Sequence, residues 1–171
     1  MCIRECGDRM SKKRLEVYCG KGKGKTTAAI GQALKAASKG KSVFIIQFLK
    51  GRELEKVSFI QRLEPEIKLF RFQRREEAFQ QLTVQEQEEE IMNMKNGLGF
   101  AKKVLATGEC DVLILDEVLG LIEYGIASVE DIRLILEEAS DDVELIFTGI
   151  KVHPEIVEWA DGVYRISAVK E

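Results

Sequence analysis

The feature that most constrains the fold is the segment Gly20–Thr27, GKGKGKTT, which stands between an apolar run and a helical pattern. The apolar run, Leu15–Cys19, is typical of a buried strand. The helical pattern covers residues 26–38, with one apolar face at Ile30, Ala33, Leu34 and Ala37. A glycine-rich turn from a strand into a helix directs backbone N–H groups into one small space at the positive end of the helix. The segment therefore predicts a phosphate-binding loop.

The residue types in this loop suit a nucleotide. Glycines let the backbone approach a phosphate closely, Lys25 can reach the phosphate oxygens, and the Thr26 hydroxyl is placed to ligate Mg²⁺. We therefore predict nucleotide binding by Gly20, Lys21, Gly22, Lys23, Gly24, Lys25, Thr26 and Thr27. A glycine-rich turn carrying surface lysines is the alternative, and the strand–loop–helix context disfavours it.

The loop is one residue shorter than the usual G-x-x-x-x-G-K-[ST] pattern. Counting back from Gly24 places Cys19 where the first glycine should stand, whereas Gly20 gives G-x-x-x-G-K-T. The phosphate cradle is therefore expected to be tighter than usual. This departure weakens the interpretation as a common GTPase or ATPase.

A second part of a nucleotide site follows the apolar run Val112–Leu115, which leads into Asp116 and Glu117. Acidic residues at the carboxyl end of a central strand lie beside the phosphate loop in open α/β sheets. There they can hold Mg²⁺ directly or through water. We predict a magnesium site made by Thr26 with Asp116 or Glu117.

The rest of the chain alternates short apolar runs with helical patterns, which indicates a mostly parallel sheet of about six strands with helices on both faces. With the phosphate loop, this predicts an α/β fold of P-loop NTPase (RecA-like) architecture. Further strands are expected at 42–48, 67–72, 111–115, 143–147 and 162–166. Helices are expected at 51–64, in a long stretch that opens at the Thr83–Glu86 capping box, from 128, and at 154–160. Residues 1–13 are predicted to be a flexible tail, and residues 14–171 a single domain.

The acidic cluster Glu86–Glu90 is predicted to be the solvated opening turn of the long helix, because negative charge suits the positive end of a helix.

Composition excludes other classes of function. Lys and Arg number 26 against 29 Asp and Glu, for a net charge of −3, so nothing favours a nucleic acid as partner. No apolar run has the length of a membrane span, and the polar first residues resemble no secretory signal. We therefore expect a cytoplasmic protein with no membrane association.

The four cysteines include no C-x-x-C pair, and a single histidine cannot complete a usual zinc cage. Reduced, unlinked thiols are therefore expected. Metal binding by Cys2 and Cys6 would need ligands from elsewhere in the chain.

The string GKGKGKTTAAIGQALKAASKGKSVFIIQFLKG, followed by Glu53 and later by DVLILDEV and FTG, resembles the corrinoid adenosyltransferases. The likeness runs from about residue 14 to residue 169. The short loop together with the QFLKG segment at residues 47–51 is its most specific part.

The resemblance implies that the cobalt(I) of a reduced corrinoid attacks C5′ of ATP and expels triphosphate. The nucleophile is then the substrate's own metal, so no serine, cysteine or histidine nucleophile is needed. Lys25 and Glu117 are the implied catalytic residues, supported by backbone amides and Mg²⁺ that neutralise the leaving group. The resemblance further implies ATP and a reduced corrinoid as substrates, a flavin-type reductase as partner, and a homodimer.

Two other functions stay open from the sequence: a non-catalytic nucleotide-binding relative that acts as carrier or regulator, and a P-loop ATPase. The stretch before the long helix, FRFQRREEAFQQL at residues 70–82, lacks the glycine and tryptophan that the family usually has there. Ile150 and Lys151 follow Thr148-Gly149, where the family usually has arginine, and the family's closing tail is absent. We therefore expect a weaker affinity for the corrinoid. Aromatic residues that could replace the tryptophan are Phe70, Phe72 and Phe79.

Overall fold

The computed structural model describes residues 14–49 and 59–171. The predicted tail at 1–13 and most of the predicted helix at 51–64 lie outside this part of the chain. Six strands form one sheet in the order β3-β2-β4-β5-β1-β6, and every neighbouring pair is parallel. The strands are β1 (Arg14–Cys19), β2 (Val43–Gln47), β3 (Ile67–Arg71), β4 (Val112–Asp116), β5 (Glu144–Thr148) and β6 (Gly162–Arg165). The predicted parallel six-stranded sheet is confirmed.

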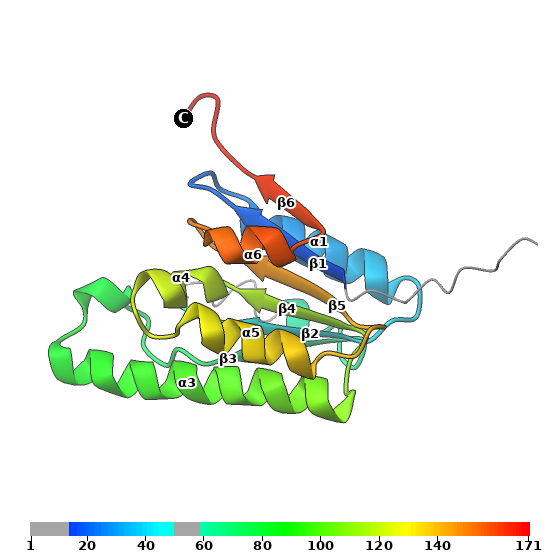
Figure 1. Ribbon diagram of the computed structural model, residues 1–171, viewed down its shortest axis with the longest axis horizontal. Helices are drawn as coiled ribbons and strands as arrows, with labels where there is room; N and C mark the ends of the chain where they lie inside the picture. The colour runs from blue at the N-terminus through cyan, green and yellow to red at the C-terminus, as the bar shows by residue number, and fades with distance from the viewer. Residues whose placement is uncertain (1–13, 50–58) are drawn as a thin grey trace, which may run out of the picture.

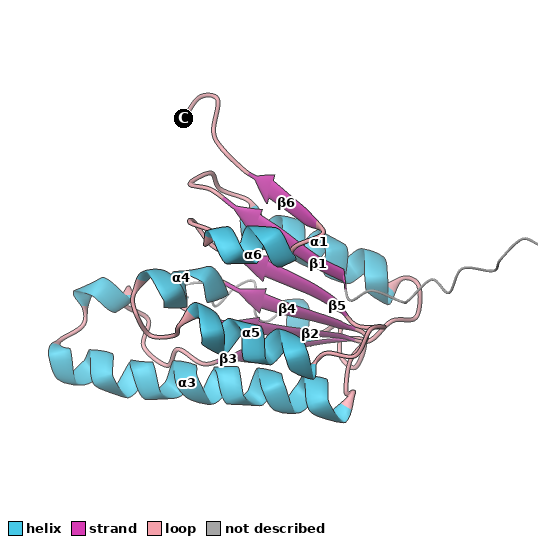
Figure 2. Ribbon diagram, in the orientation of Figure 1, coloured by secondary structure: helices cyan, strands magenta, loops and turns pink. Residues whose placement is uncertain are grey.

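Helices cover both faces of this sheet, as predicted (Figures 1 and 2). One face carries α1 (Lys25–Ala37). The other carries α3 (Val84–Thr107), α4 (Val118–Glu123), α5 (Val129–Glu138) and α6 (Pro154–Trp159). A short 3₁₀ turn, η1 (Phe79–Gln81), precedes α3. Each face buries its own hydrophobic cluster, and the four central strands supply side chains to both.

The predicted apolar face of α1 is confirmed in part. Its buried apolar side chains are Ala29, Ala33 and Ala36, whereas Leu34 is 44% exposed. Small side chains allow a helix to lie close to a sheet, so the alanine stripe faces the strands and the larger residues lie at its margins. Of the predicted face, Ala33 is buried and both Ile30 and Ala37 pack partly buried against the same cluster, so the prediction fails only at Leu34.

The long helix begins as predicted and departs from prediction at one residue. Thr83 and Glu86 form the expected capping box, and Gly108 ends the helix with φ of 66°. Glu90, however, is only 1% exposed. The interpretation of Glu86–Glu90 as a solvated turn is therefore wrong for Glu90, because a neighbouring loop covers it.

Helix α4 was not predicted, because six residues are too few to show a helical period. It starts directly after β4, where Glu117 has φ of 62° and turns the chain into the helix. It packs tightly on the end of β5: a methyl group at Gly149 would lie 2.4 Å from the Leu119 Cβ. This packing fixes the residues that follow β4 relative to those that follow β5.

Candidate active site

The carboxyl ends of the central strands bring the predicted site residues to one edge of the sheet. The register pairs Gln47 of β2 with Asp116 of β4, and Tyr18 of β1 with Thr148 of β5. The loop 20–24 leaves β1 at this same edge and enters α1. The site is therefore built on rigid strand ends, with one flanking loop.

Two glycines shape the loop by packing on neighbouring backbone. The Gly20 N–H donates to the Ile150 carbonyl at 2.9 Å, and the Gly22 N–H donates to the Ile166 carbonyl at 2.9 Å. A methyl group at Gly22 would lie 2.8 Å from that Ile166 carbonyl oxygen, so no larger residue fits without movement. Both N–H groups are thus used within the fold. These two N–H groups are therefore not available to a phosphate in this conformation of the loop.

The first turn of α1 has the geometry of an anion site. Gly24 is the N-cap with φ of 103°, and no side chain caps the helix. The opening N–H groups of a helix have no partner within it, and its dipole favours negative charge there. Lys25 is buried and its Nζ donates to the Gly22 carbonyl at 3.0 Å. Lys21, Lys23 and Thr27, by contrast, are exposed on the loop and the helix start.

Asp116 is the centre of the polar contacts at the strand ends. Its carboxylate is fully buried and accepts hydrogen bonds from the Thr26 hydroxyl at 3.0 Å, the Gln47 amide at 3.1 Å and the Thr148 hydroxyl at 2.6 Å. Burying a carboxylate costs free energy unless such donors satisfy it. The structure therefore joins Thr26 to Asp116, one of the two pairs predicted.

Glu117 belongs to the same cluster through its backbone. Its N–H donates to the Thr148 hydroxyl at 2.8 Å, and Thr148 in turn donates to Asp116. Its side chain is half-buried beside α4. Thr148 thus fixes the two acidic residues relative to one another.

Sequence reasoning assigned no role to Gln47 or Thr148. Each is a buried polar residue that closes an otherwise apolar strand, at VFIIQ and ELIFT. That pattern was the available signal, since such a residue needs a buried partner. The partner, Asp116, closes the neighbouring strand in the same way.

The donor set fits Mg²⁺. Hydroxyl and carboxylate oxygens are the ligands that this ion prefers, and it is commonly held by one or two carboxylates together with substrate phosphates. Among residues 14–49 and 59–171, no cluster of three or more His, Cys, Asp or Glu side chains could hold a metal ion. Thr26 and Asp116 bring one hydroxyl and one carboxylate of this kind together at the strand ends.

The structure also bears on the cysteines, the histidine and the expected absence of a membrane span. Cys19 and Cys110 are free and buried, as expected for reduced thiols. The single histidine, His153, caps α6 by accepting the Glu155 N–H. Within the described ranges, no helix combines the length and apolar character needed to cross a bilayer.

Comparison with known proteins identifies relatives over nearly the whole chain. Residues 11–171 match the family model described as ATP:corrinoid adenosyltransferase BtuR/CobO/CobP. A corrinoid adenosyltransferase of Escherichia coli K12 is 34% identical over 154 residues, which cover 90% of this chain and 76% of the relative. Corrinoid adenosyltransferase CobA of Salmonella typhimurium is 32% identical over 154 residues, which again cover 90% of this chain and 76% of the relative. A corrinoid adenosyltransferase of Pseudomonas aeruginosa is 26% identical over 91% of this chain and 75% of its own length.

Proposed function

The chain belongs to the ATP:corrinoid adenosyltransferase family, and from this premise we propose that it transfers the 5′-deoxyadenosyl group of ATP to the cobalt(I) of a reduced corrinoid. The bond that forms joins cobalt to C5′, and the bond that breaks joins C5′ to the triphosphate oxygen. Both electrons of the new bond come from cobalt, and triphosphate leaves with the electrons of the broken one. The observation that carries the proposal is the contact of Thr26 with Asp116 at the mouth of the phosphate loop.

The residues of the chain bind and orient the leaving group. The first turn of α1 presents N–H groups to the phosphates, and Lys25 lies across the loop, where its ammonium group can turn from the Gly22 carbonyl to a phosphate oxygen. Positive charge placed in advance around a leaving triphosphate lowers the barrier. Mg²⁺, held by Thr26 and Asp116 with Glu117 beside them, would supply further neutralisation of the phosphate charge. No side-chain nucleophile is required, since the substrate's cobalt attacks.

The binding site is tested by removing these groups one at a time. Lys25→Ala removes a charge-assisted hydrogen bond worth about 1.5–3 kcal/mol, so Mg-ATP affinity should fall by about 10- to 100-fold. Thr26→Ala should act through the metal, raising the Mg²⁺ concentration needed for binding more than it weakens binding at saturating Mg²⁺. Lys39→Ala removes the same charge as Lys25→Ala from an exposed position and is the matched control. Calorimetry with unchanged Mg-ATP affinity in both site variants would refute the phosphate-site assignment.

The carboxylate of Glu117 is proposed to support the metal. Glu117→Gln keeps the shape of the side chain and should leave the fold intact while turnover falls by about 10- to 100-fold. The effect should be largest at limiting Mg²⁺. Equal activity of the variant and the wild type under that condition would assign the role to Asp116 alone.

The transfer itself is tested by mixing the protein with Mg-ATP and a chemically reduced corrinoid under anaerobic conditions. A new cobalt–carbon bond, seen as a light-sensitive change in the corrinoid absorbance, is the expected result. Tight Mg-ATP binding with no such product would favour a carrier or regulator instead.

Two properties of the proposed enzyme rest on its family alone: we propose a flavin-type reductase as the source of cobalt(I) and a homodimer as the assembly. The cytoplasm is proposed as the location, from the sequence pattern. The transfer assay does not depend on the reductase, because chemical reduction replaces it.

A further inference from the structure

The segment from Phe72 to Leu82 links β3 to α3, and it contacts a site residue at its start and the end of α4 near its close. At its start, the Phe72 N–H donates to the Gln47 carbonyl at 3.2 Å, and the Gln47 side chain donates to Asp116. Near its end, the Phe79 ring packs against Tyr124 at the end of α4, with ring centroids 5.6 Å apart. We call residues 72–82 the β3–α3 segment.

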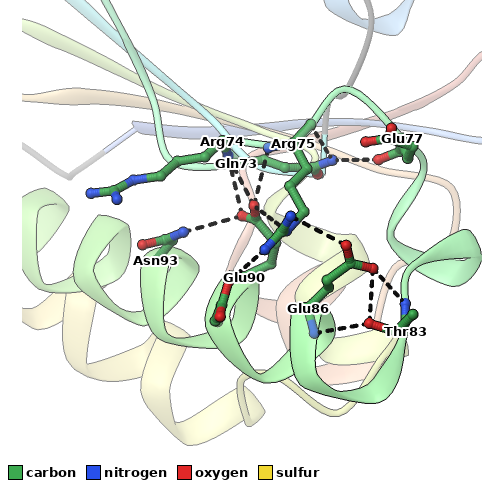
Figure 3. Close-up of polar contacts among 9 residues, drawn as sticks. Gln73, Arg74, Arg75, Glu77, Thr83, Glu86, Glu90 and Asn93 are labelled. Carbon is green, nitrogen blue, oxygen red and sulfur yellow. Dashed lines mark hydrogen bonds and ion pairs between the residues drawn. The ribbon is translucent and has the colours of Figure 1, made fainter.

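The carboxylate of Glu90 holds the turn of this segment from below. It accepts the Arg74 N–H at 3.2 Å, the Arg75 N–H at 3.0 Å and the Asn93 side-chain amide at 3.3 Å (Figure 3). Two successive backbone N–H groups directed at one oxyanion form an anion-binding concavity, and here the protein fills it with its own side chain. At 1% exposure, the carboxyl oxygens of Glu90 are shielded from water, so these hydrogen bonds supply the partners that burial would otherwise remove.

Two further anchors hold the same turn. The buried Gln73 amide donates to the carbonyls of Arg75 and Glu77 at 3.0 and 2.8 Å, which closes the turn on itself. The Arg75 guanidinium forms ion pairs with Glu86 (Figure 3) and Glu89 on the first turns of α3, and its Nε lies 3.9 Å from a carboxyl oxygen of Glu90. These exposed pairs contribute little free energy, so Glu90 is the main attachment of the turn to the helix.

The two phenylalanines of the segment, Phe72 and Phe79, lie in different environments. Phe72 packs on Phe100 within the hydrophobic face of the sheet, as Phe70 does. Phe79 instead packs on the half-exposed Tyr124 at the end of α4. The bonds of Glu90 therefore set the path of the chain between a core position and an edge position.

The β3–α3 segment that Glu90 holds on α3 lies near the edge of the sheet where the reaction takes place. The phosphates bind beside β1 and α1, and the second substrate must approach C5′ of the nucleotide from elsewhere on the same edge. The β3–α3 segment borders that edge beyond β2 and α4. We propose that Glu90 is a positioning residue for the corrinoid: it fixes the wall of the space in which the corrinoid meets the nucleotide. This inference rests on the proposed transferase function.

The test compares Glu90→Gln with Glu88→Gln. Both variants remove one charge from the same helix, but Glu88 is exposed, whereas the new amide at position 90 would turn an NH₂ group toward N–H donors. Calorimetry measures the affinity for cob(II)alamin and, separately, for Mg-ATP. In Glu90→Gln, corrinoid affinity should fall by about 10- to 100-fold, because a small displacement of a binding wall costs that much. Mg-ATP affinity should change less than about twofold, a separation that a general loss of folding would not produce. Hydrogen exchange at residues 74–82 should accelerate.

Unchanged corrinoid affinity in Glu90→Gln would overturn the inference, as would an equal loss of corrinoid and Mg-ATP affinity. A similar corrinoid loss in Glu88→Gln would overturn it too, since charge alone would then explain the effect. If the wild type binds cob(II)alamin but forms no cobalt–carbon bond, the proposed function fails while the affinity comparison still decides the role of Glu90. Absence of cob(II)alamin binding by the wild type would overturn both.

Discussion

Thr148 offers the sharpest test of the polar cluster at the strand ends, because a single hydroxyl joins the two acidic residues. It donates to Asp116 at 2.6 Å and accepts the Glu117 N–H at 2.8 Å, and its side chain is fully buried. Thr148→Val keeps the shape of the side chain and removes both bonds. No volume change then obscures the result.

The expected cost follows from the two bonds. A hydrogen bond to a charged group contributes about 1.5–3 kcal/mol, and a buried N–H left without a partner costs about 1–3 kcal/mol. Because both losses come from one hydroxyl and the site can relax, we expect the free energy of unfolding to fall by about 2–4 kcal/mol in total. For a chain of this size each kcal/mol lowers Tm by about 2–4 °C.

Urea unfolding followed by circular dichroism measures this change. Thr148→Ser keeps the hydroxyl and loses one methyl group, so it should cost only about 0.8 kcal/mol. Thr107→Val, at an exposed position near the end of α3, should change stability by less than about 0.5 kcal/mol. If Thr148→Val costs no more than Thr148→Ser, the hydroxyl does not organise the acidic pair and the reasoning is refuted.

Two further predictions concern residues outside the active site. Burial raises the pKa of the Cys110 thiol from 9.0 to about 12, so iodoacetamide at pH 8.5 should modify Cys110 in urea but not in the folded protein. The free energy of unfolding should fall as the pH rises from 9.0 toward about 12, because only the unfolded thiol ionises in that range. Modification of Cys110 in the native protein, detected by peptide mass spectrometry, would contradict the expected protection of this thiol. Ser128→Ala removes the side-chain cap of α5 and should lower the free energy of unfolding by about 1 kcal/mol in urea titration. Ser140→Ala is the control, because Ser140 is exposed and is not the N-cap of a helix. An equal loss of stability in the two variants would show that the Ser128 cap contributes nothing.

The sheet and its loop were predictable because their signals are local. Strand–loop–helix order around Gly24 and Lys25 identified the phosphate loop, and apolar runs of five to seven residues identified the strands. Parallel strands placed their carboxyl ends at one edge, so the meeting of Thr26 with Asp116 followed from topology.

The sequence could not show which polar groups would share a partner. Gln47 and Thr148 lie 69 and 32 residues from Asp116, and only the register of the sheet brings them to its carboxylate. The burial of Glu90 was missed for the same physical reason. Its neighbours on the helix surface are charged, and the loop that covers it comes from 15 and 16 residues earlier in the chain.

The identity of the polyphosphate product tests the proposed transfer most directly. Phosphorus NMR can follow Mg-ATP in the presence and absence of a chemically reduced corrinoid, with the wild-type protein and with Lys25→Ala. We predict intact triphosphate, formed only with the reduced corrinoid and in amounts equal to the new cobalt–carbon bond, and little product from the variant. Orthophosphate released at enzymatic rates without corrinoid would contradict the account, since it would show a β–γ cleavage by a positioned water and hence an ATPase.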